Sequence, residues 1–322
     1  MEIFPSINLR ATIISFVIIL FNIIIPANAI ELSSCVTNVK EFGDKGDGLN
    51  DDASSIQKAI NSAIKNGGGI VFFSPGIYKI LSTIKYSNKI LLYGSGQDVT
   101  VIDVQFEGTG LEPMDKFDKL TIFPETAYMT IKTSNKKGIV GVDTSNVIRG
   151  HFHHLVVKDF KSVNIKVWGE GGSKFNGYNV FERITLSGSP IQIHIFGVSN
   201  ENVVKESQFD AYKWGYEQGN RKGIGIMFGR EEDIGKRRFM SNNNRITNSS
   251  FENLEIGILI NHGIRHSISF NRFEAVDTAV VFRKNIKGSS DLHVLLFNYY
   301  SVDGTVPVRL LDEGTYRLQK IE

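Results

Sequence analysis

Residues Glu41–Ile60 read EFGDKGDGLNDDASSIQKAI, and they join a turn rich in aspartate and glycine to a helical pattern. Asp51 or Asp52 can accept the free N–H groups of a first helical turn, and the glycine run at residues 67–69 ends the pattern. The apolar stripe of this helix is formed by Ile56, Ala59, Ile60, Ala63 and Ile64. The stretch therefore predicts a turn and a capping helix, Ser54–Lys65, within a capping segment at residues 39–66.

The aspartates of this stretch lack the spacing of a known ion or phosphate site. A calcium loop needs alternating aspartates before a glycine and a glutamate at its last position, and a phosphate loop needs a glycine-rich run ending in lysine. Neither pattern is present. We expect the four aspartates to shape the turn and cap the helix: Asp44, Asp47, Asp51 and Asp52.

The remaining chain favours β-structure. The whole chain has 322 residues, 31 glycines, 22 phenylalanines and a net charge of +2, which gives no strong field for nucleic acid. Short runs of β-branched and aromatic residues alternate with turn residues. From about residue 128 to residue 312 these runs repeat; for example, Phe251 and Phe273 are 22 positions apart. This repeat predicts an all-β solenoid whose turns bury their apolar faces on one another; a two-sheet sandwich, the alternative, would not repeat one strand in phase.

The N-terminus has the pattern of a targeting segment. Arg10 precedes the apolar run Ile13–Ile25, and Ala27-Asn28-Ala29 fits a cleavage site. We expect residues 1–29 to be a removed secretory signal, which predicts a secreted, periplasmic or cell-surface protein, with an uncleaved anchor as the alternative. The single cysteine, Cys35, cannot form an internal disulfide. Residues Leu32–Cys35 resemble a lipobox, but a true lipobox directly follows the apolar run. A lipid anchor at Cys35 is therefore a minor alternative.

Three segments between Val39 and Ile102 carry a resemblance to a known family: VKEFGDKGDGLNDDASSIQKAI, GGGIVFFSPGIYKI and LLYGSGQDVTVI. Together they resemble the entry segment of the pectate lyase-like superfamily, nearest to its rhamnogalacturonase/epimerase-like branch, which also occurs in phage tailspikes. The resemblance implies a single right-handed parallel β-helix domain over residues 30–322, with an N-terminal capping helix. It also implies lyase, hydrolase or epimerase chemistry on acidic glycans.

Two sets of family motifs are absent from the sequence. Of the polygalacturonase motifs, only Asn261-His262-Gly263 has a near match, and its partners are missing. The calcium-binding aspartates of pectate lyases cannot be aligned either. We therefore expect no cofactor, with calcium possible but without an identified ligand set.

Aligning the repeats predicts a site on one outward column. The strands at residues 164–167, 192–195 and 215–218 place Lys166, His194 and Glu217 at the same position, pointing away from the core. Strands about 4.8 Å apart bring these side chains close enough to share acid–base work. His194 would be the base, Lys166 would neutralise a sugar carboxylate, and Glu217 would orient His194 or act as the acid. The alternative is that these three side chains are ordinary solvent-exposed polar residues without a catalytic role.

Aromatic and basic residues near this column are candidates for substrate binding. Trp168 and Phe196 share the next outward column and, with Trp214, could stack against sugar rings; mutual packing of the aromatics is the alternative. The interruption Asn220–Asn242 carries Arg221 and Lys222, which suit a polyanion, although a solvated mixed-charge loop is equally compatible. A glycosidase would need a second carboxylate, for which the sequence offers Asp210, Glu182 or Glu170.

A histidine cluster, GHFHHL at residues 150–155, raises the question of a metal. On a strand, His151 and His153 share one face and His154 points away. Zinc is bound by three or four protein ligands, and only two histidines share a face here. No metal site is therefore expected there.

Two functional hypotheses follow. The first is an exported enzyme, a polysaccharide lyase or glycoside hydrolase or an epimerase, that acts on an acidic polysaccharide. The second is a non-catalytic glycan-binding, adhesin or polysaccharide-assembly protein. Neither involves nucleic acid, and the sequence does not determine the oligomeric state.

Overall fold

The computed structural model describes residues 36–211, 221–233, 240–283, 292–301, 305–310 and 317–321. The described residues belong to one compact unit, Val36–Glu322. The predicted signal segment at residues 1–29, Cys35, Trp214 and Glu217 lie outside the described residues. Among the helices that are described, none is long and apolar enough to cross a bilayer.

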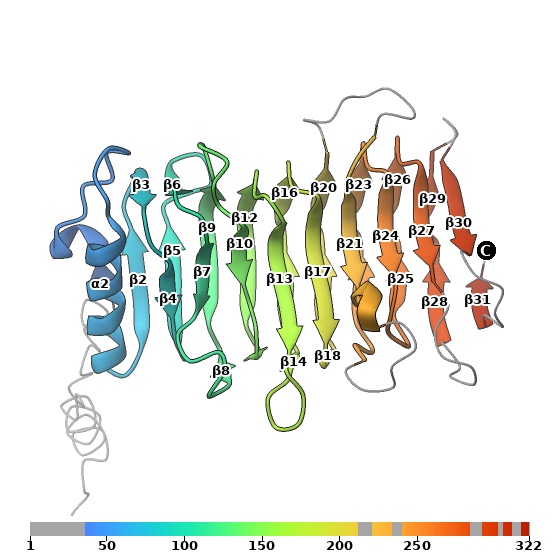
Figure 1. The fold of residues 1–322 in the computed structure, drawn as a ribbon, viewed down its shortest axis with the longest axis horizontal. Coiled ribbons are helices and arrows are strands. Elements are labelled where there is room, and N and C mark those ends of the chain that lie inside the picture. The colour runs from blue at the N-terminus through green and yellow to red at the C-terminus, as the bar shows by residue number, and fades with distance from the viewer. Residues whose placement is uncertain are drawn as a thin grey trace, which may run out of the picture. The chain divides into compact units, whose positions relative to one another are not determined.

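The strands of this unit stack along one axis as successive turns of a coil (Figure 1). One turn runs through four strands: β13 (Val163–Gly169), β14 (Asn176–Gly177), β15 (Val180–Glu182) and β16 (Thr185–Ser187). Strand β17 (Ile191–Gly197) begins the next turn. Every registered pairing between these turns is parallel; β13 pairs with β17, and β15 with β19 (Val203–Lys205). This architecture is a parallel β-helix, which confirms the fold class predicted from the sequence.

Three sheets form the faces of the coil within the described part of the chain. The nine-stranded sheet also contains β4 (Ile84–Tyr86), β7 (Thr109–Pro113), β10 (Val140–Asp143), β21 (Ile224–Phe228), β24 (Ile256–Ile260), β27 (Thr278–Phe282) and β30 (Val306–Leu310). The four-stranded sheet adds β8 (Thr121–Ile122), β11 (Val147–Ile148) and β18 (Ser199–Asn200).

The 18-stranded sheet bends along its length, because most turns contribute two strands to it. Residues with positive φ mark the bend; among them are His154, Arg183 and Glu206. Its further strands are β1 (Val36–Asn38), β2 (Gly69–Phe73), β3 (Gly76–Ile80), β5 (Ile90–Gly94), β6 (Thr100–Val104), β9 (Glu125–Lys132), β12 (His151–Lys158), β19 (Val203–Lys205), β20 (Gln208–Asp210), β22 (Arg245–Thr247), β23 (Ser250–Glu252), β25 (Ser267–Ser269), β26 (Arg272–Glu274), β28 (Leu292–Leu296), β29 (Tyr299–Tyr300) and β31 (Arg317–Ile321).

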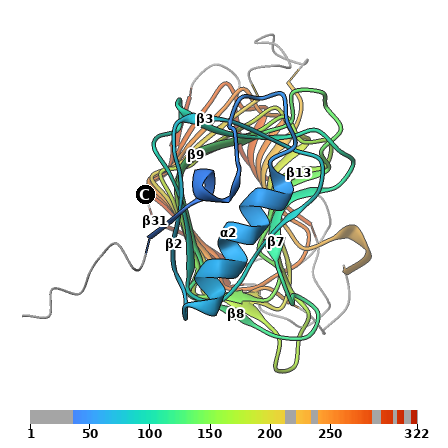
Figure 2. The ribbon, with the colours of Figure 1, turned by 90° about the vertical axis from the view of Figure 1, so that its left-hand side faces the viewer.

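A helix closes the N-terminal end of the coil. Helix α2 (Ala53–Lys65) lies across the first turn (Figure 2), and its predicted apolar stripe is buried except for Ile64, which is partly buried. Asp51 accepts the N–H of Ala53, at 3.1 Å, while Asp52 accepts the N–H groups of Lys45 and Gly46. Asp51 and Asp52 therefore shape the turn and its junction with the helix, and Asp47 accepts the N–H groups of Leu49 and Asn50 in the same turn. Asp44, in contrast, is buried with no hydrogen-bond partner among the described residues. A short 3₁₀ helix, η2 (Val39–Phe42), precedes the turn.

The core is built from ladders that repeat from turn to turn. Phe251 stacks between Phe209 and Phe273, with ring centroids 4.5 and 4.8 Å away. Buried asparagines form a second ladder, in which Asn179 donates to Asn202 at 2.9 Å and Asn202 donates to Asn244 at 3.0 Å. These amides satisfy one another inside the coil, where an unpaired polar group would be costly.

The stacked turns begin earlier in the chain than the repeat indicates. Strand β2 already pairs with β5, and β5 pairs with β9, so the coil includes residues well before position 128. The early turns have different loop lengths, which hides their period in the sequence.

Candidate functional site

The outer face of the nine-stranded sheet carries a column of charged residues. In the register of the sheet, Lys166 on β13 is paired with His194 on β17 and with Asp143 on β10, as the aligned repeats predict for the first pair. The register also places Glu112 on β7 next to Asp143. Strand alternation directs all four side chains to the same face, so the column reads Glu112, Asp143, Lys166 and His194.

Asp143 is the centre of an ion-pair network. Its Oδ2 lies 3.2 Å from Lys166 Nζ and 3.0 Å from Lys116 Nζ, and Lys116 also contacts Glu112 Oε2 at 2.6 Å. The Asp143 side chain is only 2% exposed, whereas Lys166 is 26% exposed. Burial opposes ionisation of Asp143, but the charges of Lys166 and Lys116 outweigh it and hold its pKa below the ordinary value. The centre of the network is therefore an ionised carboxylate that positions two ammonium groups.

His194 is the neutral member of the column. Burial lowers the pKa of His194 to about 4, so its imidazole is uncharged at neutral pH. The ring Nε2 lies 3.2 Å from the carbonyl oxygen of Gly229. A carbonyl only accepts, so Nε2 carries the proton and Nδ1 keeps a free electron pair. That tautomer is the one a proton acceptor needs.

Aromatic rings lie beside the column. Trp168 and Phe196 are paired in register with ring centroids 6.4 Å apart, and Lys166 Nζ lies 5.5 Å from the Trp168 ring centre. Phe196 is only 8% exposed, because Trp168, His194 and Arg230 pack around it. Phe117, 62% exposed, meets Trp168 at 6.4 Å. The accessible aromatic surface is thus formed by Trp168 and Phe117, while Phe196 supports it from below.

The next position of the column differs from the alignment of the repeats. The residue paired with His194 on the following strand is Met227 of β21, not Glu217. Residues 215–218 and 225–228 both fit the repeat pattern, and the sequence alone favoured the first. The predicted interruption Asn220–Asn242 therefore contains a core strand, and Glu217 itself lies outside the described residues, as does Trp214.

The two basic residues predicted to bind substrate lie away from the column. Arg221 precedes β21 at the opposite end of the strand from Met227; it is 6% exposed and pairs with Asp277 at 3.3 Å. Lys222 beside it is exposed. A different residue of the same segment reaches the site: Arg230, which lies 5.3 Å from the Phe196 ring centre and is held by Asp233 of the short helix η4 (Glu231–Asp233).

Sequence reasoning missed Glu112, Lys116 and Asp143. The signal for Asp143 was present, since Val140–Asp143 has the strand pattern one turn before Lys166. Lys116 lies in a loop after β7 and gave no periodic signal; its place in the column is shown by the ion pair of its Nζ with Asp143 Oδ2.

A second surface feature lies along the bend of the 18-stranded sheet. This hollow has a volume of about 460 Å³ and is polar, and its walls include His154, Arg183, Glu206, Asn248, Glu252 and Arg272. On the same sheet, Glu125, His151 and His153 come within 4.8 Å of one another through their potential ligand atoms.

Comparison with known proteins gives a family match over most of the chain. The family model described as rhamnogalacturonase A/epimerase, pectate lyase-like matches residues 36–286. This range includes every described residue of the column and both the phenylalanine and the asparagine ladder of the core.

Characterised relatives match over shorter stretches. Alginate lyase 7 of Azotobacter vinelandii is 39% identical over 85 residues, which are 26% of this chain and 10% of the relative. The mannuronan C5-epimerase AlgE6 of the same organism is 39% identical over 72 residues, 20% of this chain and 8% of the relative. Among solved structures, the Streptococcus pneumoniae surface adhesin PfbA has a TM-score of 0.65 at 15% identity, covering 88% of this chain and 76% of that one; this likeness concerns the fold alone.

Proposed function

The chain belongs to the rhamnogalacturonase A/epimerase, pectate lyase-like family, and from that premise we propose that it acts on an acidic polysaccharide by removing the proton next to a uronate carboxylate. The observation that carries the proposal is the column of Asp143, Lys166 and His194, which combines fixed cations with a neutral imidazole. The short matches to an alginate lyase and a mannuronan epimerase support a uronate substrate.

Each group of the column has a role in this reaction. Lys166, fixed by Asp143, would pair with the sugar carboxylate and so stabilise the negative charge that develops on it. Nδ1 of His194 would accept the proton from the adjacent ring carbon. The electron pair left behind moves into the carboxylate. From there it either forms the ring double bond and expels the glycosidic oxygen, which takes up the proton held by His194 and leaves an unsaturated sugar, or it returns to the ring carbon, which takes a proton from water on the other face and so inverts the centre.

Hydrolysis is less well supported by this site. A glycosidase needs one carboxylic acid that stays protonated at working pH, beside an ionised one. At the centre of this column, burial raises the pKa of Asp143, but the two neighbouring lysines lower it by more. Asp143 is therefore ionised and cannot act as that acid. We therefore favour lyase or epimerase chemistry over hydrolase chemistry.

A non-catalytic glycan-binding role is the second candidate. The observation that favours it is the pairing of Trp168 with Phe117 next to Lys116 and Lys166, since aromatic faces beside cations bind anionic sugars without any chemistry. In either role we propose that the protein works outside the cytoplasm, after removal of residues 1–29.

The test uses a panel of uronate polymers that includes alginate and polygalacturonate. Cleavage is followed by the absorbance of unsaturated ends and by new reducing ends, and epimerisation by exchange of solvent deuterium into the sugar. We expect His194→Gln and Lys166→Met each to lower the rate by about 100-fold or more. Arg272→Ala, in the hollow on the other sheet, is the matched control and should keep the wild-type rate.

The outcomes separate the two candidates. Wild-type rates in both His194→Gln and Lys166→Met would remove the column as the site. Binding of a polymer without turnover, lost in Trp168→Ala, would replace the enzyme with the glycan-binding candidate.

A further inference from the structure

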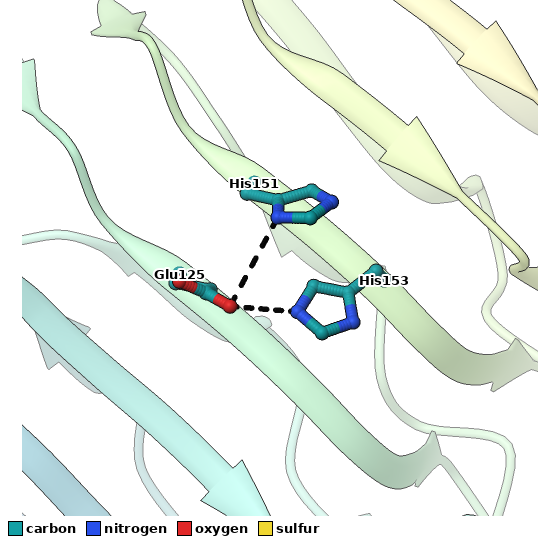
Figure 3. A group of neighbouring side chains, drawn as sticks. All are labelled: Glu125, His151 and His153. Carbon is teal, nitrogen blue, oxygen red and sulfur yellow. Dashed lines mark hydrogen bonds and ion pairs between the residues drawn. The ribbon is translucent and has the colours of Figure 1, made fainter.

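Three side chains from neighbouring turns converge on the outer face of the 18-stranded sheet. His151 on β12 is the register partner of Glu125 on β9, and His153 follows two residues later on the same face. Figure 3 shows both imidazole rings turned toward the Glu125 carboxylate. Glu125 Oε1 lies 2.7 Å from His153 Nε2 and 3.9 Å from His151 Nδ1. We propose that Glu125, His151 and His153 bind a divalent transition-metal ion of the zinc type.

The donor set suits that class of ion. Two imidazole nitrogens and one carboxylate oxygen are borderline ligands, which zinc prefers over the all-oxygen shells of calcium and magnesium. The ligand atoms lie within 4.8 Å of one another, and a small movement would bring them to the bond lengths of about 2.0–2.2 Å that zinc adopts. Three protein ligands leave a fourth position for water or another ligand.

A set of surrounding partners orients the ligands. The remaining ring nitrogen of His151, Nε2, lies 3.3 Å from Glu182 Oε2, which fixes Nδ1 as the nitrogen without a proton. Glu182 is in turn held by Lys205 at 3.3 Å and by Arg183 at 3.5 Å. Such carboxylate–histidine pairs are typical of protein metal sites, where they set the tautomer and raise ligand basicity.

His153 and Glu125 are supported in the same way. Nδ1 of His153 lies 2.8 Å from Nδ1 of His154, which can accept the proton that His153 must keep on Nδ1 when its Nε2 binds a metal. The chain bends at His154, where φ is 49°, and this bend returns its ring to His153 instead of turning it to the other face. The Tyr93 hydroxyl donates to Glu125 Oε1. Each of the three ligands therefore has an orienting partner.

The position in the fold gives an ion access to the trio. The His153 side chain is 8% exposed and anchors the site, while His151 is 40% exposed and leaves it open to solvent. His154 also belongs to the wall of the neighbouring hollow. An ion at the trio would join two adjacent turns of the coil through their side chains.

The test is a zinc titration of the mature chain, freed of any histidine tag and dialysed against a chelator. Calorimetry should give one zinc per chain, and zinc should raise the midpoint of thermal unfolding. Cobalt should bind at the same site and give the visible absorption of a four- or five-coordinate ion. Glu125→Gln and His153→Gln should each weaken zinc binding by 100-fold or more, and Glu182→Gln by about 10-fold.

Controls make the result decisive. His194→Gln removes a histidine on the other sheet and should bind zinc like the wild type. Thermal unfolding without metal identifies any variant whose fold is itself destabilised. Glu125 and His153 lie on different strands, so if one substitution disturbs its strand, the variant at the other residue still tests zinc binding. Absence of zinc binding in the wild type, or unchanged binding in Glu125→Gln, would overturn the proposal.

Discussion

At the residue scale, the proposed chemistry depends on the surroundings of His194. Its pKa falls to about 4 because the ring is buried beside Phe196 and under the segment that carries Arg230. An imidazole with the ordinary pKa of 6.5 would be half protonated at pH 6.5. The fold instead keeps His194 uncharged there, so it remains a proton acceptor over a wider pH range.

This environment predicts the pH dependence of the reaction. A base acts only when it is unprotonated, so kcat/KM should fall on the acid side through the pKa of the free enzyme. For His194 that acid limb should lie near pH 4, more than a unit below the ordinary histidine value. Measuring kcat/KM from pH 3.5 to pH 8 checks it. An acid limb near pH 6.5 would contradict the assignment of His194 as the base.

At the scale of the strand, the regular turns made part of the site predictable. Lys166, His194, Trp168 and Phe196 occupy the columns inferred from the repeats, because alternation along a strand and stacking between strands are both periodic. Glu217 was misplaced because two segments of the same region fit the pattern and only the packing selects Ile224–Phe228.

The histidine trio and the contact between Lys116 and Asp143 could not be read from the sequence for a physical reason. Glu125 meets His151 only through the register between β9 and β12, and these strands have no shared motif. Lys116 reaches Asp143 from a loop whose path depends on tertiary packing. Contacts made across turns by aperiodic segments leave no signal in the order of the residues.

The asparagine ladder gives a prediction about the stability of the turns. Asn202→Ala removes an acceptor from the backbone and side chain of Asn179 and a donor to Asn244, all buried. We expect it to lower the free energy of unfolding by about 2–4 kcal/mol, since the partners are left unpaired.

Chemical denaturation of matched variants measures this loss. Asn61→Ala, on the exposed side of helix α2, should change the free energy of unfolding by less than about 0.5 kcal/mol. Equal effects in Asn61→Ala and Asn202→Ala would show that the ladder adds no stability of its own.

At the scale of the whole molecule, the coil presents two chemically different outer surfaces. The nine-stranded sheet carries Lys166, His194, the half-buried ring of Trp168 and the exposed ring of Phe117. The 18-stranded sheet carries the histidine trio and the polar hollow at its bend. The assignment of the polysaccharide to the first surface is the central claim, and it can be separated from the metal proposal because the two surfaces share no residue.

The most direct test of that claim is the crystal structure of the His194→Gln variant with a uronate oligosaccharide that the protein binds or turns over. We expect a sugar ring stacked on Trp168 and Phe117, with its carboxylate within hydrogen-bond distance of Lys166 Nζ. An oligosaccharide bound instead in the hollow lined by Arg183, Glu206 and Arg272, with the nine-stranded face empty, would contradict it.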